Sequence, residues 1–139
     1  MNSKIKVDKF VIVVFLLCMV CNMTMQAKAY ESFKVSIYVR AYEVDKMKDI
    51  HWLDSTWTVI SQQLEVDKIY LETHRDLLVV EDATLEQAKK FFHDRGIETA
   101  GGITYTINEA NSFETFCYSN PEHRKMVQKI AEQDRKSTR

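Results

Sequence analysis

The sequence lacks the short motifs that identify several common enzyme classes. Neither GxGxxG nor GxxxxGK[ST] follows the first predicted strand, so neither a dinucleotide site nor a P-loop is indicated. GxSxG is also missing, which argues against the serine nucleophile of α/β-hydrolases. With one proline and three glycines in 139 residues, the chain has no low-complexity stretch, and its composition is that of an ordinary globular protein.

The N-terminal segment differs from the rest of the chain. Three lysines lie within the first nine residues, an unbroken apolar run covers 10–20, and the small-residue sequence AKA occupies 27–29. This order is typical of a secretory signal peptide, and the apolar run is shorter than the roughly 20 residues that span a membrane. We therefore predict a signal peptide over 1–29, cleaved after Ala29, and a secreted or periplasmic protein. A retained N-terminal anchor is the alternative.

Cleavage would leave residues 30–139 with 15 basic and 19 acidic side chains, a formal charge of −4. No basic face is apparent, so nucleic acid is not expected as a partner, and neither is a membrane after cleavage. Two of the three cysteines belong to the predicted signal peptide. Cys117 then has no partner for an internal disulfide, and we predict that it packs as a small hydrophobic residue rather than acting as a nucleophile.

The mature chain alternates strand and helix patterns. Alternating or β-branched segments predict strands over 33–40, 66–73 and 97–106, and apolar stripes at helical spacing predict helices near 55–65, 84–95 and 121–133. Strands that alternate with helices of this length favour parallel pairing through right-handed crossovers. The predicted fold class is therefore α/β, with three consecutive βα units and residues 30–139 as one domain.

Capping and packing residues support the helix assignments. The predicted caps are Asp54 or Ser55, the pair Thr84 and Gln87, Gly96 after the second helix, and Asn120 before Pro121. The predicted buried stripes are Trp57, Ile60 and Leu64 on the first helix, Leu85, Ala88, Phe91 and Phe92 on the second, and Met126, Val127 and Ile130 on the third.

The connections between these elements are asymmetric. The helix-to-strand returns are very short, whereas the strand-to-helix connections over 41–54, 74–83 and 107–119 are long. In α/β folds, long connections after the strands gather at the C-terminal edge of the sheet, where ligands bind. Polar and aromatic side chains end all three predicted strands there. The candidate substrate-binding residues are Arg40, Tyr42, Glu72, His74, Arg75 and Tyr105.

Such a mixture of carboxylate, guanidinium, imidazole and phenol groups suits a polyhydroxylated ligand. The alternative is that these side chains only solvate loops. Glu72 and His74 lack a second histidine–carboxylate cluster nearby, so no metal is expected, and no other cofactor is indicated. The glycines in "AGG" at 100–102 lie inside a strand, where they let a backbone or a ligand approach closely rather than cradle a phosphate.

Four stretches carry a resemblance to a known family: "FKVSIYVRAYEV", "VDKIYLETHRD", "ATLEQAKKFFHDRGIETAGGITYT" and "FCYSNPEHRKMVQKIAE". They resemble the N-terminal part of secreted, glycoside-hydrolase-like (β/α)₈ barrel proteins of Bacteroidetes-type bacteria, over about 33–132. The resemblance implies a carbohydrate substrate. It also implies that the catalytic carboxylates lie on a fourth strand, for which this chain has "AEQDRKSTR" instead. No residue here is therefore assigned a catalytic role.

A (β/α)₈ barrel needs roughly 200–250 residues, so residues 30–139 supply three βα units of eight, an incomplete TIM barrel. Its open sheet edge is expected to favour self-association. The main hypothesis is the N-terminal, substrate-binding part of an exported glycoside hydrolase, truncated before its catalytic carboxylates and inactive alone. The alternatives are a small non-catalytic α/β module that binds a glycan or a protein, and a remnant that does not fold stably.

Overall fold

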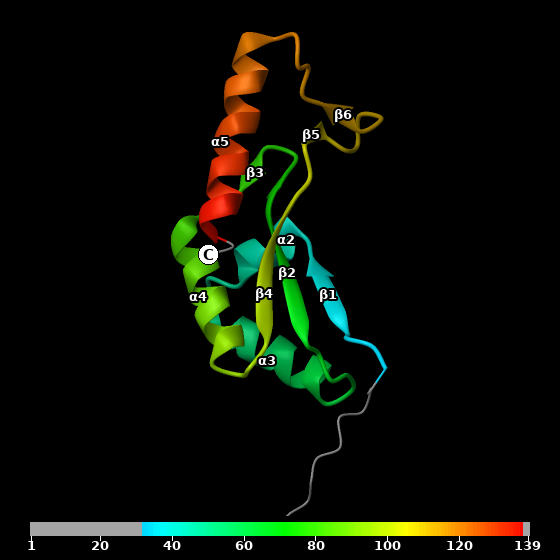
Figure 1. Ribbon diagram of the computed structural model, residues 1–139, viewed down its shortest axis with the longest axis vertical. Coiled ribbons are helices and arrows are strands. Elements are labelled where there is room, and N and C mark those ends of the chain that lie inside the picture. The colour runs from blue at the N-terminus through cyan, green and yellow to red at the C-terminus, as the bar shows by residue number, and fades with distance from the viewer. Residues whose placement is uncertain (1–31, 138–139) are drawn as a thin grey trace, which may run out of the picture.

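The computed structural model describes residues 32–137, so the predicted signal peptide over 1–29 lies outside the described residues. The fold is a small α/β domain, in which helices pack on a sheet whose three main strands are parallel (Figure 1). Its strands and helices are β1 (Ser36–Val39), α2 (Ala41–Lys46), α3 (Ile50–Ser61), β2 (Lys68–Arg75), β3 (Leu78–Val79), α4 (Asp82–His93), β4 (Glu98–Ile103), β5 (Thr106–Asn108), β6 (Glu114–Thr115) and α5 (Pro121–Ser137).

The three predicted strands pair in parallel and in sequence order. β2 lies in the centre, β1 pairs along one side of it and β4 along the other. The predicted parallel pairing of these three strands is confirmed, but the sheet is mixed, because β3 pairs antiparallel with the end of β2, and β5 and β6 form a separate hairpin. Over residues 32–137 the sheet is open and does not close into a barrel.

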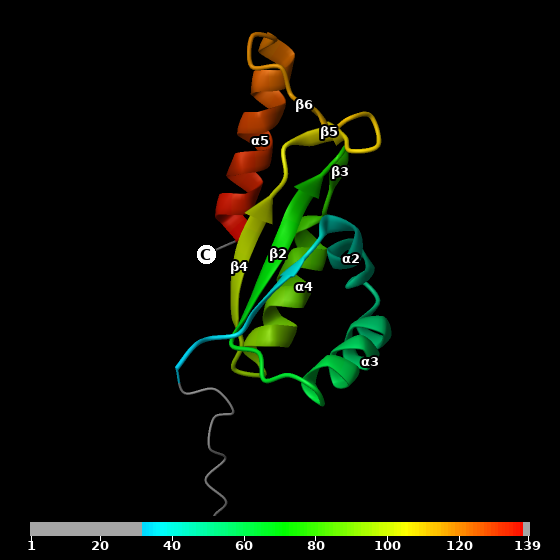
Figure 2. The same cartoon turned by 90° about the vertical axis from the view of Figure 1, so that its right-hand side faces the viewer.

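The helices cover one face of the sheet. Figure 2 shows α3 and α4 on the same side of β1, β2 and β4, while the opposite face carries no helix of the described chain. Strand alternation therefore separates two sets of side chains. Ile37 and Val39 pack against the core cluster, whereas Tyr38 on the opposite face is 49% exposed. None of the helices within 32–137 combines the length and apolar character needed to cross a bilayer.

The core lies between the sheet and helices α2 to α4. The predicted stripe of α4 is confirmed, because Leu85, Ala88, Phe91 and Phe92 are all buried. The Trp57 ring meets the Phe92 ring edge to face, with 5.3 Å between centroids. Ile60 of α3 and Leu64, which lies beyond the end of that helix, are partly buried against the same cluster. On α5 the prediction is only partly right: Ile130 is buried and Val127 half-buried, but Met126 is exposed.

Several local predictions were wrong. The segment 41–54 is mostly helical rather than a loop, and α3 is capped by Asp49, whose carboxylate accepts from the backbone N–H groups of His51 and Trp52. The expected cap Thr84 is buried in the core, and α4 begins earlier, after Glu81. The start of α3 is thus set by a local cap at Asp49, whereas the start of α4 leaves Thr84 inside the helix and buried.

The later caps were predicted correctly. Gly96 adopts a left-handed φ of 74° just after α4, and the Asn120 side chain accepts from the Glu122 backbone N–H at the start of α5. Cys117, predicted to pack as a small hydrophobic residue, is instead exposed near the start of α5, where its thiol lies 3.3 Å from the Ser119 hydroxyl. The segment around it leads from the β5–β6 hairpin into α5, outside the main core.

Candidate functional site

Glu72 lies at the centre of a hydrogen-bonded network at the C-terminal edge of the parallel strands. The side chain is fully buried, yet five donors reach its two oxygens. Oε2 accepts from the Ala41 backbone N–H at 2.7 Å and from Arg75 Nε at 2.7 Å. Oε1 accepts from Arg75 Nη2 and the Tyr38 hydroxyl, both at 2.8 Å, and from the Thr104 hydroxyl. The network therefore joins the ends of β1 and β2 to the segment after β4.

These contacts keep Glu72 ionised. Burial acts to raise the pKa of its carboxyl, but the hydrogen bonds from Arg75, Thr104, Ala41 and Tyr38 outweigh burial and hold the pKa below its usual value. The hydrogen bond between Tyr38 and Glu72 has the opposite effect on the pKa of the Tyr38 phenol. Burial of its hydroxyl, the hydrogen bond to Glu72 and the carboxylate charge raise the pKa of Tyr38 to about 12. At neutral pH the Glu72 carboxylate is therefore ionised, and the Tyr38 phenol keeps its proton.

A second set of contacts surrounds Asp76, which follows β2 and has a left-handed φ of 52°. The Tyr42 hydroxyl donates to its Oδ2, and the Glu109 backbone N–H donates to its Oδ1 at 2.9 Å. The Asp76 backbone N–H in turn donates to the Thr106 hydroxyl at 3.0 Å. Arg75 completes the connection, because its Nη1 pairs with the Glu109 carboxylate. The β5–β6 hairpin is thereby attached to the end of β2.

The Tyr42–Asp76 contact also shifts the pKa values of both side chains. The hydrogen bond from Tyr42 lowers the pKa of Asp76, and the same bond raises the pKa of Tyr42. Tyr42 is nevertheless 40% exposed, so its ring remains available to a ligand. Arg40 is likewise open to solvent, with its guanidinium paired to Glu43 at 3.0 Å. Tyr42 and Arg40, both predicted to bind substrate, form the accessible part of the site.

His74 and Tyr105 lie apart from this accessible part. His74 is buried, and its Nδ1 donates to the Thr104 carbonyl oxygen at 2.7 Å, while its ring contacts that of Phe116. The pairing of β2 with β4 is irregular between Glu72 and His74, so simple alternation does not relate them. Tyr105 is half-buried, and burial together with nearby Tyr118 raises its pKa.

The glycine-containing segment of β4 has a specific role here. A Cβ atom on Gly102 would lie 2.8 Å from Cε2 of Tyr38 and 2.9 Å from its hydroxyl oxygen. The close approach expected of "AGG" is therefore made by the Tyr38 ring. This ring also stacks on Tyr70 of the neighbouring strand, with 6.4 Å between centroids and 23° between planes. The two rings form a partly exposed aromatic surface on the helix-free face.

Sequence reasoning missed Tyr38 and Glu109. Tyr38 had a usable signal, because it shares the parity of Arg40 on the first predicted strand and is two residues from its end. Glu109 had none, since it lies in a hairpin that the sequence pattern did not predict. Thr104, which lies within the predicted strand over 97–106, donates its hydroxyl to Glu72, and its carbonyl oxygen accepts from His74.

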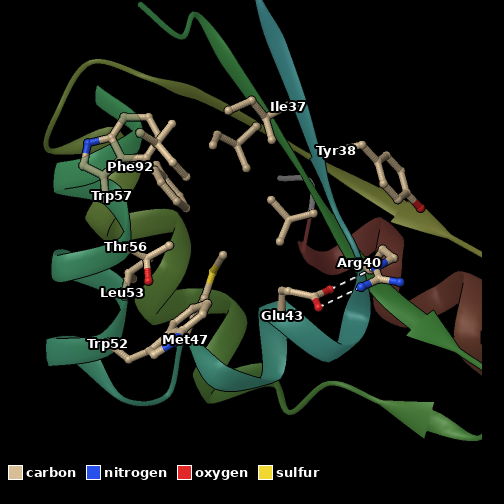
Figure 3. A pocket seen from close by; sticks show the side chains of 13 residues that line it. Ile37, Tyr38, Arg40, Glu43, Met47, Trp52, Leu53, Thr56, Trp57 and Phe92 are labelled. Carbon is tan, nitrogen blue, oxygen red and sulfur yellow. Dashed lines mark hydrogen bonds and ion pairs between the residues drawn. The ribbon is translucent and has the colours of Figure 1, made fainter. Parts of the chain in front are cut away.

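A separate apolar groove lies on the other side of β1, between this strand and α3. Its volume is about 410 Å³. Figure 3 shows Trp57 and Phe92 towards one end and the Arg40–Glu43 pair towards the other, with Ile37 facing the groove and Tyr38 on the far side of the strand. The lining residues are Ile37, Tyr38, Val39, Arg40, Glu43, Met47, Trp52, Leu53, Thr56, Trp57, Ile60, Ile69 and Phe92.

The arrangement at the strand ends is suited to recognition more than to proton transfer. Its carboxyls with a shifted pKa, Glu72 and Asp76, are both held in the ionised form. A general acid would instead need a raised pKa. In the described part of the chain, no group of three or more His, Cys, Asp and Glu side chains is arranged to bind a metal. Exposed phenol and guanidinium groups remain, and these bind hydroxyls and planar faces.

Comparison with known proteins gives one match. Residues 22–137 match the profile of the family described as "Probable glycosyl hydrolase, catalytic domain". Searches of curated proteins and of solved structures found no match. The matched segment covers most of the sequence, including every strand and helix of the described fold. The protein therefore belongs to this family of glycosyl-hydrolase-type catalytic domains.

Proposed function

We propose that this chain is the N-terminal, substrate-binding part of an exported glycoside hydrolase that acts on glycans, of the type secreted by Bacteroidetes-type bacteria. The observation that carries the proposal is the polar network at the C-terminal edge of the parallel strands, in a chain of a glycosyl hydrolase family. That edge is where (β/α)₈ enzymes bind their substrates. The sequence order β1–β2–β4, with helices on one face, is also the order of consecutive barrel units.

We assign the direct contacts with a glycan to the exposed groups. Arg40 donates planar hydrogen bonds to hydroxyls, and the rings of Tyr42 and Tyr38 pack against the apolar face of a sugar. Of the remaining predicted residues, Glu72 and Arg75 support this surface through their hydrogen-bonded network, whereas His74 and Tyr105 lie apart from it.

The chemistry needs further carboxyls. Glycoside hydrolysis usually uses two, of which one is a general acid with a raised pKa. Glu72 and Asp76 both have lowered pKa values. Burial raises the pKa of Asp134, but this residue lies on α5 beside Thr73 and not among the exposed groups. We therefore propose that the acid and its partner come from a part of the enzyme outside the described residues. The described part alone would then bind glycans weakly and would not hydrolyse them. Reading the genomic DNA beyond codon 139 tests this, since an apolar strand ending in paired acids is expected there.

Glycan binding can be measured on the purified protein by amide chemical-shift changes, which detect weak complexes. A panel of oligosaccharides that differ in sugar and linkage should shift the amides around Arg40 and Tyr42. Arg40→Ala and Tyr42→Ala should abolish these shifts. Lys90→Ala is the matched control, because Lys90 is an exposed, ion-paired cation at the opposite end of the sheet. If no glycan moves these amides, or Lys90→Ala has the same effect, the proposed binding surface is wrong.

A non-catalytic binding module is the second candidate, and the lowered carboxyl pKa values favour it equally. Affinity separates the two. Tight glycan binding by this chain alone indicates a complete module, whereas weak binding that becomes tight in a longer polypeptide indicates the hydrolase.

Export is tested independently. We propose cleavage after Ala29, so N-terminal sequencing of secreted material should begin at Tyr30. Intact Met1 in a membrane fraction would instead indicate a retained anchor.

A further inference from the structure

Helix α2 begins without a side-chain cap of its own. Its N-cap residue, Arg40, makes no capping hydrogen bond, and the Arg40 side chain is paired with Glu43 instead. The N–H groups of the first turn of a helix need acceptors. For Ala41 the acceptor is Glu72, 31 residues later in the sequence and on a different element. A six-residue helix is thus anchored at its first residue by a strand carboxylate.

The same carboxylate has no capacity left for a substrate. Two carboxylate oxygens offer about four lone-pair sites, and five donor contacts from four residues already converge on Glu72. The side chain is also fully buried. Direct contact between Glu72 and a glycan would require several of these bonds to break.

We infer that Glu72 is a positioning residue, which fixes helix α2 and the Tyr38 ring relative to the ends of β2 and β4. The inference builds on the proposed function, because Arg40 and Tyr42 at the start of α2 carry the proposed glycan contacts. Moving the first turn of α2 would move both. Arg75 contributes to the same arrangement, since its guanidinium makes two bonds to Glu72 and a further one to the Thr104 hydroxyl at 3.2 Å.

Glu72→Gln tests the inference with little change in size. The amide offers one acceptor oxygen where the carboxylate offered two, so Ala41, Arg75 and Tyr38 cannot all be satisfied. We expect the pKa of the Tyr38 phenol, measured from its Cζ carbon signal, to fall below about 12, because the hydrogen bond and the charge of Glu72 both raise it, although burial, the largest cause, remains. We also expect hydrogen exchange of the Ala41 amide to accelerate at least tenfold.

Glu109→Gln is the matched control. It removes the same charge and also touches Arg75, but the hydrogen bonds of Glu109 in this network go to Arg75 and Asp76, not to Tyr38 or Ala41. This variant should leave the Tyr38 titration and the Ala41 exchange unchanged. If both variants shift the pKa of Tyr38 equally, the shift results from the loss of one negative charge and not from the Glu72 contact, and the positioning role is refuted. Unchanged Tyr38 titration and Ala41 exchange in Glu72→Gln would refute it as well.

A measurement on the unmodified protein keeps the inference testable even if Glu72→Gln does not fold. As pH falls, the Ala41 amide proton should shift with a midpoint below 4.5, the usual value for a glutamate, because that proton reports protonation of its acceptor. An Ala41 amide whose shift stays constant while the side-chain carboxyl carbon of Glu72 titrates in the folded protein would overturn the inference. None of these readouts requires a ligand. The positioning role of Glu72 can therefore be tested even if no glycan is found to bind.

Discussion

Replacing Gly102 with alanine should displace the Tyr38 ring without straining the backbone. Gly102 has no left-handed φ, so alanine fits its main-chain conformation. The new Cβ would lie 2.8, 2.9 and 3.1 Å from three atoms of Tyr38, closer than such contacts allow. Because Tyr38 is 49% exposed, its ring can move towards solvent rather than distort β4. The cost is then the loss of the bond to Glu72 and of the stacking on Tyr70.

The magnitude follows from those two contacts. A hydrogen bond to a charged group contributes about 1.5–3 kcal/mol when buried, and an aromatic pair about 0.5–1.5 kcal/mol. Partial exposure reduces both, and replacing glycine by alanine within a strand returns roughly 0.5–1 kcal/mol. We expect a net loss of about 1–2 kcal/mol, which lowers the melting temperature of a domain of this size by roughly 5–10 °C.

A double-mutant cycle with Tyr38→Ala isolates the cause. Without the Tyr38 ring, the three atoms nearest to the Cβ at position 102 are gone, so Gly102→Ala should be neutral or stabilising by about 0.5 kcal/mol in that background. Thermal and urea unfolding of the four proteins supply the coupling energy. A loss in the Tyr38→Ala background equal to the loss in the parent would show that Gly102 is needed for another reason, and would refute the reasoning.

Further expectations concern the ion pair, acid stability, the core and the groove. Arg75→Met should destabilise the protein by about 3–5 kcal/mol in urea unfolding, because Glu72 would remain buried without its bidentate partner; a loss below 1 kcal/mol would contradict this. The folded pKa of Glu72 is depressed, so its stabilisation is complete above pH 4.5 and should disappear as the pH falls through the folded value, and Glu72→Gln should flatten that part of a pH–stability curve. Phe92→Ala should cost about 3–5 kcal/mol, because the side chain is 1% exposed and packs edge to face on Trp57. We also propose that the open β1 edge and its groove mediate self-association, which sedimentation velocity should detect and Thr56→Lys, on the groove wall, should weaken.

The order of the parallel strands and the buried face of α4 were predictable because both depend on long periodic patterns. In α4, four apolar residues recur at helical spacing and all four are buried. Thr84 illustrates the limit of the local pattern. Its spacing from Gln87 matches a capping box, but Thr84 is 4% exposed in the core and Gln87 donates instead to the Met47 carbonyl oxygen at 2.7 Å. Tertiary packing decided the position of that helix start.

Helix α2 was not predictable for a different reason. Six residues contain fewer than two turns, so its apolar spacing over Ala41 and Val44 carries little information. Its N-terminal acceptor is also remote, because Glu72 is far away in the sequence. For the same reason only part of the site's contacts could be expected from the sequence. Glu72 and Arg75 are three residues apart at the end of one strand and form an ion pair, whereas Glu109 pairs with Arg75 from a hairpin that was not predicted.

A carboxylate at the end of a buried strand can serve either chemistry or structure, and its hydrogen-bond donors distinguish the two. A catalytic acid needs an environment that favours its neutral form, such as burial without compensating donors. Glu72 is as buried as such an acid, but the donors around it outweigh burial and lower its pKa. An acidic residue followed three positions later by arginine, at the exit of an apolar strand, therefore predicts a structural ion pair as readily as an active site. In this protein the pair organises the surface on which Arg40 and Tyr42 remain exposed, so any substrate would meet the residues that Glu72 positions and not Glu72 itself.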